Sequence, residues 1–170
     1  MGEAAESAAG RAAVDTPSPP APPPWATRLR YWAVVLAWMA LISYLSTDAF
    51  SAANTHRYLD PVLRWLFPSI SNAELRDAHT VIRKSAHFAE FLVLGVLAVW
   101  AQRAGRPIAW RGRWTLSALL LVVAYASLDE FHQSFVASRT PSFADTGIDV
   151  LGGVVGQAFL YLRHRLRFRD

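Results

Sequence analysis

Three stretches of the chain carry polar side chains whose types suit anion binding or proton transfer. Lys84, His87 and Glu90 follow one another in steps of three residues. On a helix, such steps stay close to one face while advancing about 9 Å along the axis. The other two stretches hold acids, a histidine, an amide and one arginine: Asp129, Glu130, His132, Gln133, Arg139, Asp145 and Asp149.

Each side chain has an expected role if the three stretches meet in space. Lys84 and Arg139 would bind an anion, Arg139 through the fork of its guanidinium. His87 and Glu130 are the candidate catalytic acid and base. The other polar groups would orient this pair or complete a network: Glu90, Asp129, Gln133, Asp145 and Asp149. The competing interpretation is a satisfied polar network that only fixes helix packing.

A metal site is an alternative use of the same side chains. His87 with Glu90, and Glu130 with His132, would offer two imidazoles and two carboxylates, a set that suits zinc or manganese. Such loose spacing often arises by chance. The chain contains no Cys, which excludes Cys-bound zinc, disulfides and thiol nucleophiles. We therefore expect no metal and no other cofactor.

Four apolar blocks must position these groups. They cover residues 31–45, 86–101, 114–128 and 148–162. A helix needs about 20 residues to cross about 30 Å of hydrocarbon, and flanking Arg and Trp side chains can supply the remainder. The blocks predict an all-α fold, an integral membrane bundle of four transmembrane helices. The polar groups open the second and fourth spans and close the third, so all are expected at one membrane face.

Weaker elements are expected between the first and second spans. Asp60-Pro61 is typical of a helix start, with Asp as N-cap and Pro as the first residue of a short interfacial helix that ends at Pro68. Ser71 and Glu74 form a capping-box pattern, so another helix starts there and could run into the second span. No special role is expected for the histidines assigned to loops and tails, His56, His79 and His164.

Glycines in the fourth block indicate a close helix contact. Gly152 and Gly156 lie one helical turn apart. This spacing of small residues lets two membrane helices approach closely. We expect both glycines to serve helix packing.

The two ends of the chain differ in composition from its middle. Residues 1–26 are rich in Ala and Pro and predict a disordered cytoplasmic tail. The start is acidic and lacks an apolar run, so it is not a secretory signal. Residues 27–165 would form the transmembrane domain, and residues 166–170 a basic cytoplasmic end. The formal net charge of +4 comes from Arg beside apolar blocks, which indicates a membrane and no nucleic-acid partner.

The distribution of Lys and Arg predicts the orientation. The loop between the second and third spans holds Arg103, Arg106, Arg111 and Arg113. Four more Arg follow the fourth span, whereas residues 129–147 contain Arg139 as their only basic residue. Short loops rich in Lys and Arg stay in the cytoplasm. We expect a multi-pass protein of the cell membrane with both termini cytoplasmic and the polar groups at the outer face.

The polar stretches also resemble a known family. Over residues 30–162 the chain is similar to the VanZ-like family, through R-K-S-A-H-F-A-E-F, S-L-D-E-F-H-Q-S-F-V-A-S-R and D-T-G-I-D-V-L-G-G-V-V-G. The residues that match its pattern are Lys84, His87, Glu130, Gln133, Arg139, Asp145, Gly152 and Gly156. Phe91 stands where the family usually has Tyr, and Asp149 where it usually has Asn. The family is named for a membrane protein associated with low-level teicoplanin resistance, so the resemblance implies a multi-pass membrane domain related to the cell envelope and antibiotic resistance.

The expected function is recognition of an anionic lipid or cell-wall group at the outer membrane face, linked to the envelope or glycopeptide response. The lipid bilayer is the other expected partner. Two alternatives stay open: a non-enzymatic scaffold or partner-binding protein whose polar cluster is structural, and a small oligomeric transporter. Catalysis would require the acid and base to reach one substrate, a distance that the sequence does not give.

Overall fold

The computed structural model describes residues 24–47, 52–104, 110–135 and 142–167, and this part of the chain is all-helical. It contains five helices and no strand. The helices are α1 (Trp25–Leu45), α2 (Ala52–Leu66), α3 (Asn72–Arg103), α4 (Gly112–Gln133) and α5 (Phe143–Arg167). The all-α prediction is confirmed. Each predicted span falls within one longer helix, because the polar residues at the block ends continue the helix.

The longest helix, α3, is the centre of the fold. Its 32 residues would extend about 48 Å, and it contacts each of the other four helices. Ser71 caps its start, because the Ser71 hydroxyl accepts a hydrogen bond from the Glu74 backbone while the Glu74 carboxylate accepts one from the Ser71 backbone. The predicted capping box is confirmed, and the helix that it opens does run into the second apolar block.

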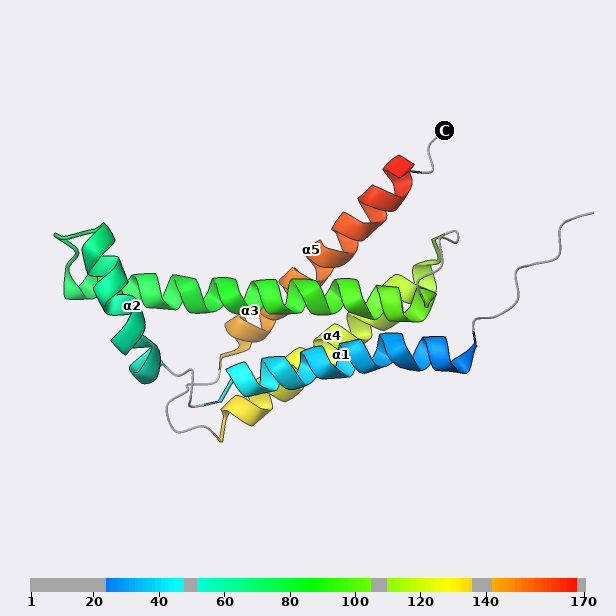
Figure 1. Cartoon of the computed structure of the whole chain (residues 1–170), viewed down its shortest axis with the longest axis horizontal. Coiled ribbons are helices and arrows are strands. Elements are labelled where there is room, and N and C mark those ends of the chain that lie inside the picture. Colours follow the sequence, from blue (N-terminus) through cyan, green and yellow to red (C-terminus); the bar gives the residue numbers. More distant parts are fainter. Residues whose placement is uncertain (1–23, 48–51, 105–109, 136–141, 168–170) are drawn as a thin grey trace, which may run out of the picture.

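Three helix ends lie together at one side of the bundle, beside the middle of α3. In Figure 1 the C-terminal ends of α1 and α4 lie beside the N-terminal end of α5, and α3 passes them toward its own N-terminus. We call this side the polar end, formed by residues 45–47, 83–90, 129–133 and 142–149. The N-terminal turns of α3 project beyond it, and α2 packs against the projecting part.

The predicted start of the interfacial helix is wrong. Asp60 and Pro61 lie inside α2, which begins at Ala52. Proline removes one helical hydrogen bond, but this helix continues through that position and ends at Leu66. Asp60 contacts two histidine side chains instead of capping the backbone, as described below.

The apolar core fills the space between α1, α3 and α4. Its most deeply buried side chains include Ile42 of α1, Phe91 of α3 and Val122 of α4. Tyr125 of α4 lies against Phe91, and its hydroxyl bonds to Ser43 of α1 at 2.8 Å. The core therefore holds α1 and α4 against α3. At the polar end, Ser46 directly after α1 and Asp129 of α4 continue this contact through a hydrogen bond.

Helix α5 packs on α3 through glycines. A Cβ at Gly152 would overlap with the carbonyl oxygen of Phe88, and a Cβ at Gly156 would overlap with that of Leu92. A Cβ at Gly95 of α3 would overlap with the carbonyl oxygen of Gly153, whereas a Cβ at Gly153 would meet the side chain of Val122 on α4. Only glycine permits this approach of the two backbones, so the contact positions the first turns of α5 beside those of α3 that carry His87.

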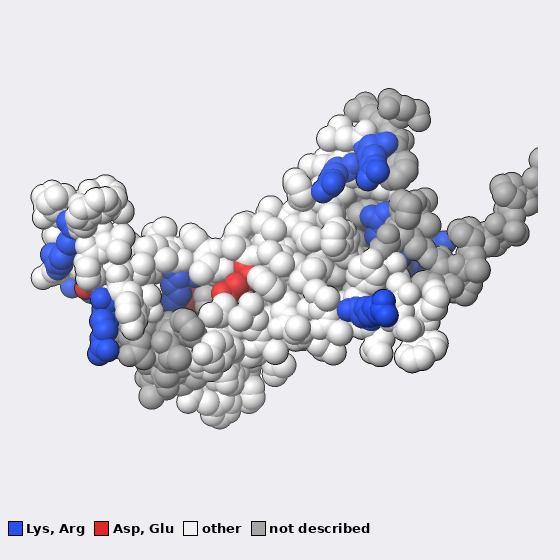
Figure 2. Space-filling view, in the orientation of Figure 1, with Lys and Arg blue, Asp and Glu red and all other residues white. Residues whose placement is uncertain are grey.

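Two of the helices, α3 and α4, are long and apolar enough to cross a membrane by length and composition. Helices α1 and α5, with 21 and 25 residues, do not reach the same apolar character. Asp145, Asp149 and Gln157 lie within α5. Figure 2 shows Lys and Arg gathered toward the two ends of one face, with a small acidic patch and a wider uncharged surface between them.

The predicted terminal segments fall mostly outside the described residues. Residues 1–23 and 168–170 are not described, so the predicted tails stay predictions. The helices extend slightly beyond the predicted transmembrane domain, residues 27–165, because α1 begins at Trp25 and α5 ends at Arg167.

Candidate functional site

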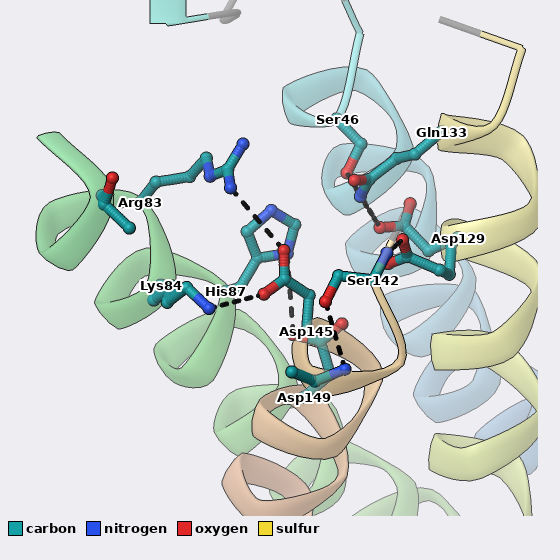
Figure 3. A network of polar contacts seen from close by, with 12 residues as sticks. Ser46, Arg83, Lys84, His87, Asp129, Gln133, Ser142, Asp145 and Asp149 are labelled. Carbon is teal, nitrogen blue, oxygen red and sulfur yellow. Dashed lines mark hydrogen bonds and ion pairs between the residues drawn. The ribbon is translucent and has the colours of Figure 1, made fainter. Parts of the chain in front are cut away.

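Two cations of α3 bind one carboxylate of α5 at the polar end. Lys84 Nζ lies 2.8 Å from Asp145 Oδ1, and Arg83 Nη2 lies 3.6 Å from Asp145 Oδ2. Figure 3 shows both side chains directed at this carboxylate. The predicted anion-binding residue Lys84 is therefore already paired with a carboxylate of the chain itself. Arg83 was not predicted, although it directly precedes Lys84.

His87 lies between two acids. Its Nδ1 atom is 3.6 Å from Asp149 Oδ1 on α5 and 4.0 Å from Glu90 Oε2 on α3. Asp149 is almost completely buried, with 2% of its surface exposed. The step of three residues from His87 to Glu90 and the glycine contact with α5 together produce this arrangement.

Asp129 of α4 is buried to the same degree and is held by two donors. Its Oδ2 atom accepts hydrogen bonds from Gln133 Nε2 at 2.7 Å and from Ser46 Oγ of α1 at 3.0 Å. Ser46 was missed by the sequence analysis, because a serine 83 residues away carries no pattern that relates it to Asp129. Figure 3 places this group beside the first turns of α5.

The other predicted residues are arranged differently. Glu130 accepts a hydrogen bond from the backbone N–H of Ser142, just before α5, so its carboxylate joins α4 to α5. No described contact joins Glu130 to His87, its predicted catalytic partner. His132 is exposed on α4. Arg139 lies outside the described residues, so its predicted anion contact is not described.

A second polar cluster lies where α2 meets α3, and we call it the His–Asp–His cluster. Asp60 Oδ1 lies 2.6 Å from His79 Nε2 and 3.1 Å from His56 Nδ1. These hydrogen bonds lower the pKa of Asp60 below its ordinary value of 3.8, and the bond with His79 has the larger effect. The expectation that His56 and His79 lie in loops without a role is wrong. Both histidines lie in helices. The step of four residues from His56 to Asp60 is the feature of the sequence that could have indicated their contact.

A cavity of about 430 Å³ connects the two polar clusters, and we call it the α2–α3 cavity. Its walls combine basic, polar and apolar side chains from the end of α1, from α2 and from α3: Leu45, Thr55, His56, Leu59, Arg76, His79, Thr80, Ile82, Arg83, Ala86, His87 and Glu90. Arg76 and Arg83 give it positive charge, while Glu90 is an acid of the same wall and Arg83 also contacts Asp145 of α5. The apolar residues could contact a hydrocarbon chain, so the cavity suits an amphiphile with an anionic head.

The comparison with protein families agrees with this architecture. The family described as VanZ/LLP1 matches residues 31–164, which include all of the polar end. The chain belongs to the VanZ/LLP1 family. No curated protein and no solved structure matches it. Family membership and the two apolar helices together indicate a membrane protein, and the resemblance found in the sequence is confirmed.

Proposed function

We propose that this VanZ/LLP1 protein crosses the membrane four times, through α1, α3, α4 and α5, and binds an anionic amphiphile in the α2–α3 cavity at the outer face. The α2–α3 cavity itself is the observation that carries the proposal, because it combines arginines with an apolar wall. The ligand class is a lipid with a phosphate head, including lipid-linked cell-wall precursors.

Outward-facing apolar residues support the inclusion of α1 and α5 among the spans. Both helices expose large aliphatic and aromatic side chains along their length, among them Val34, Leu36 and Leu41 on α1 and Leu151, Val154, Phe159 and Leu162 on α5. A soluble monomer rarely exposes so much contiguous apolar surface. In contrast, Asp129, Asp149, Gln133 and Gln157 are buried. Polar residues inside and apolar residues outside are the pattern of a helical membrane bundle.

Helix α2 fits a position in the membrane interface. Tyr58, Val62, Trp65 and Leu66 are exposed and recur at helical spacing, so they share one apolar face. An amphipathic helix of this kind lies flat with its apolar face in the boundary between headgroups and acyl chains. The α2–α3 cavity would then lie at headgroup depth, where it can receive a phosphate.

The charges of the cavity favour a phosphate over a zwitterionic head. Arg76 and Arg83 lie on one helix, two turns apart, and both line the cavity. Arginine binds phosphate oxygens through paired N–H groups. His87 and Glu90 line the same cavity, so two titratable side chains lie near the proposed position of the bound head. Binding is the proposed activity, and its link to the glycopeptide response would arise through a cell-wall lipid.

Native mass spectrometry of the purified protein in detergent tests the binding. The ligands are phosphatidic acid and phosphatidylcholine with the same acyl chains, and inorganic phosphate serves as competitor. We expect the wild type to prefer phosphatidic acid about tenfold or more, since a charge-assisted hydrogen bond contributes about 1.5–3 kcal/mol. Replacement of both cavity arginines, Arg76→Gln with Arg83→Gln, should remove the preference.

Arg30→Gln is the matched control, because Arg30 is an exposed arginine at the opposite end of the bundle and does not line the cavity. It should keep the wild-type preference. Equal preference in the wild type and the double variant would refute the lipid site and leave a structural role for the polar end. Displacement of lipid by inorganic phosphate alone would show that the head, rather than the amphiphile, is recognised.

A further inference from the structure

We propose that His87, Asp129 and Asp149 bind a divalent transition-metal cation, and we call these residues the metal triad. One ligand atom from each lies within 4.8 Å of those of the other two. The three residues come from α3, α4 and α5, so an ion at this position would tie three helices together. This inference goes against the expectation of no metal that the sequence alone suggested.

Two orphaned oxygens point to a cation. Oδ1 of Asp129 and Oδ1 of Asp149 are both buried and accept no hydrogen bond from the described residues. Both residues are 2% exposed. A buried carboxylate oxygen without a donor or counter-charge costs free energy in proportion to its lost hydration. His87 Nδ1 lies 3.6 Å from Asp149 Oδ1, beyond hydrogen-bond distance, and the nearby cations Arg83 and Lys84 bind Asp145 instead.

Asp129 is held as a metal-ligating carboxylate is usually held. Ser46 and Gln133 donate to its Oδ2 atom, which fixes the orientation of the carboxylate and leaves Oδ1 for another partner. Hydrogen bonds of this kind from outside the ligand set orient metal ligands in proteins. Asp149 is positioned by packing instead: the close contact of Gly152 with the Phe88 backbone of α3 holds Asp149 near His87.

The ligand set selects the class of metal. One imidazole nitrogen and two carboxylate oxygens suit Zn²⁺, Mn²⁺ or Fe²⁺, and the lack of thiolate disfavours soft ions. Atoms bound to one zinc at about 2.1 Å lie about 3–4 Å apart, so the triad needs to contract by at most about 1–2 Å on binding. Three protein ligands leave at least one position open, and His87 also lines the α2–α3 cavity.

Cobalt titration tests the triad on the full chain, purified with a tag free of histidine and stripped with a chelator. Co²⁺ replaces Zn²⁺ in such sites and reports its ligands by visible absorption. We expect the wild type to bind one equivalent at micromolar or tighter affinity, and Asp149→Asn and Asp129→Asn to weaken the binding at least tenfold. His79→Gln is the matched control, because it removes a histidine from the His–Asp–His cluster, the other group of suitable spacing. It should bind as the wild type does.

A variant that keeps a ligand guards against simple misfolding. His87→Cys introduces the only thiol of the chain. A thiolate bound to Co²⁺ gives an intense near-ultraviolet charge-transfer band, so this band should appear in His87→Cys and be absent from His87→Ala. Absence of the band, absence of binding by the wild type, or loss of binding in His79→Gln with full binding in Asp149→Asn would each overturn the proposal. No lipid is added in this titration, so its failure is distinct from failure of lipid binding.

Discussion

Carboxylates at the polar end and at the α2–α3 contact are held in different ways. Asp145 binds two cations, Asp129 accepts two hydrogen bonds on one oxygen, and Asp60 lies between two histidines. Asp60 is the most exposed of these three, and its ionised form is the one that both histidines stabilise. The strength of the α2–α3 contact should therefore depend on pH.

Asp60→Asn should reduce the thermal stability of the protein in detergent only while Asp60 is ionised. Because folding lowers the pKa of Asp60, its contribution to stability is fully present above the ordinary value of 3.8 and is lost as the pH falls through the lower folded value. The difference in melting temperature between the two proteins should hold from about pH 7 to about pH 5 and shrink toward about pH 3.

The two histidines that contact Asp60 are the same in both proteins, since each keeps His56 on α2 and His79 on α3. Asp77→Asn, which alters an exposed acid on α3, is the control and should show no such dependence. A difference for Asp60→Asn that stays constant down to about pH 3 would contradict the assigned hydrogen bonds.

Residue spacing was sufficient to predict part of the polar end and not the rest. Steps of three and four residues along one helix identify His87 with Glu90, and Asp145 with Asp149, because helix geometry alone brings them to one side. Ser46 and His79 were missed because their partners lie on other helices, and only tertiary packing brings them together. The assigned roles of Lys84 and Glu130 were incomplete for the same reason, since their partners Asp145 and Ser142 belong to α5.

At the scale of elements, the contact between α3 and α5 determines where the site forms. Glycines on α5 bring its backbone onto α3, which places Asp145 and Asp149 against Lys84 and His87. The apolar blocks and glycine spacing predicted these helices well. The start of α2 was not predicted, because Asp-Pro is also compatible with a helix interior when tertiary contacts stabilise it.

Gly156→Ala should destabilise the protein, because the added methyl overlaps with the carbonyl oxygen of Leu92 and must push α5 away from α3. We expect a loss of about 1–3 kcal/mol, seen as a lower melting temperature in detergent. Gly147→Ala is the matched control on the same helix, since nothing lies within 4 Å of a Cβ there. It should be neutral or slightly stabilising, because alanine favours helix over glycine. If both variants melt alike, the glycine contact does not hold the helices together.

For the molecule as a whole, the arrangement in the membrane depends on how many of the helices cross it. Composition supports α3 and α4 most directly, whereas α1 and α5 are included because both expose large apolar side chains, and α5 also buries Asp149 and Gln157. The alternation of helix direction then follows, with the polar end on one side and the starts of α1 and α4 on the other (Figure 1). With the N-terminal end of α3 outside, this topology puts the α2–α3 cavity at the outer membrane face.

Accessibility of single cysteines in intact cells tests this topology most directly. The chain has no Cys of its own, so labelling by an impermeant thiol reagent reports only the introduced position. Ser69→Cys lies between α2 and α3, Gly112→Cys at the start of α4, and Arg167→Cys at the end of α5, all at exposed positions. We expect Ser69→Cys to react in intact cells and the other two variants to react only after permeabilisation. Equal labelling of Ser69→Cys and Gly112→Cys would mean that α3 does not cross, and labelling of Arg167→Cys together with Ser69→Cys would mean that α5 does not. Labelling in the reverse sense would place the polar end in the cytoplasm and contradict a site at the outer face.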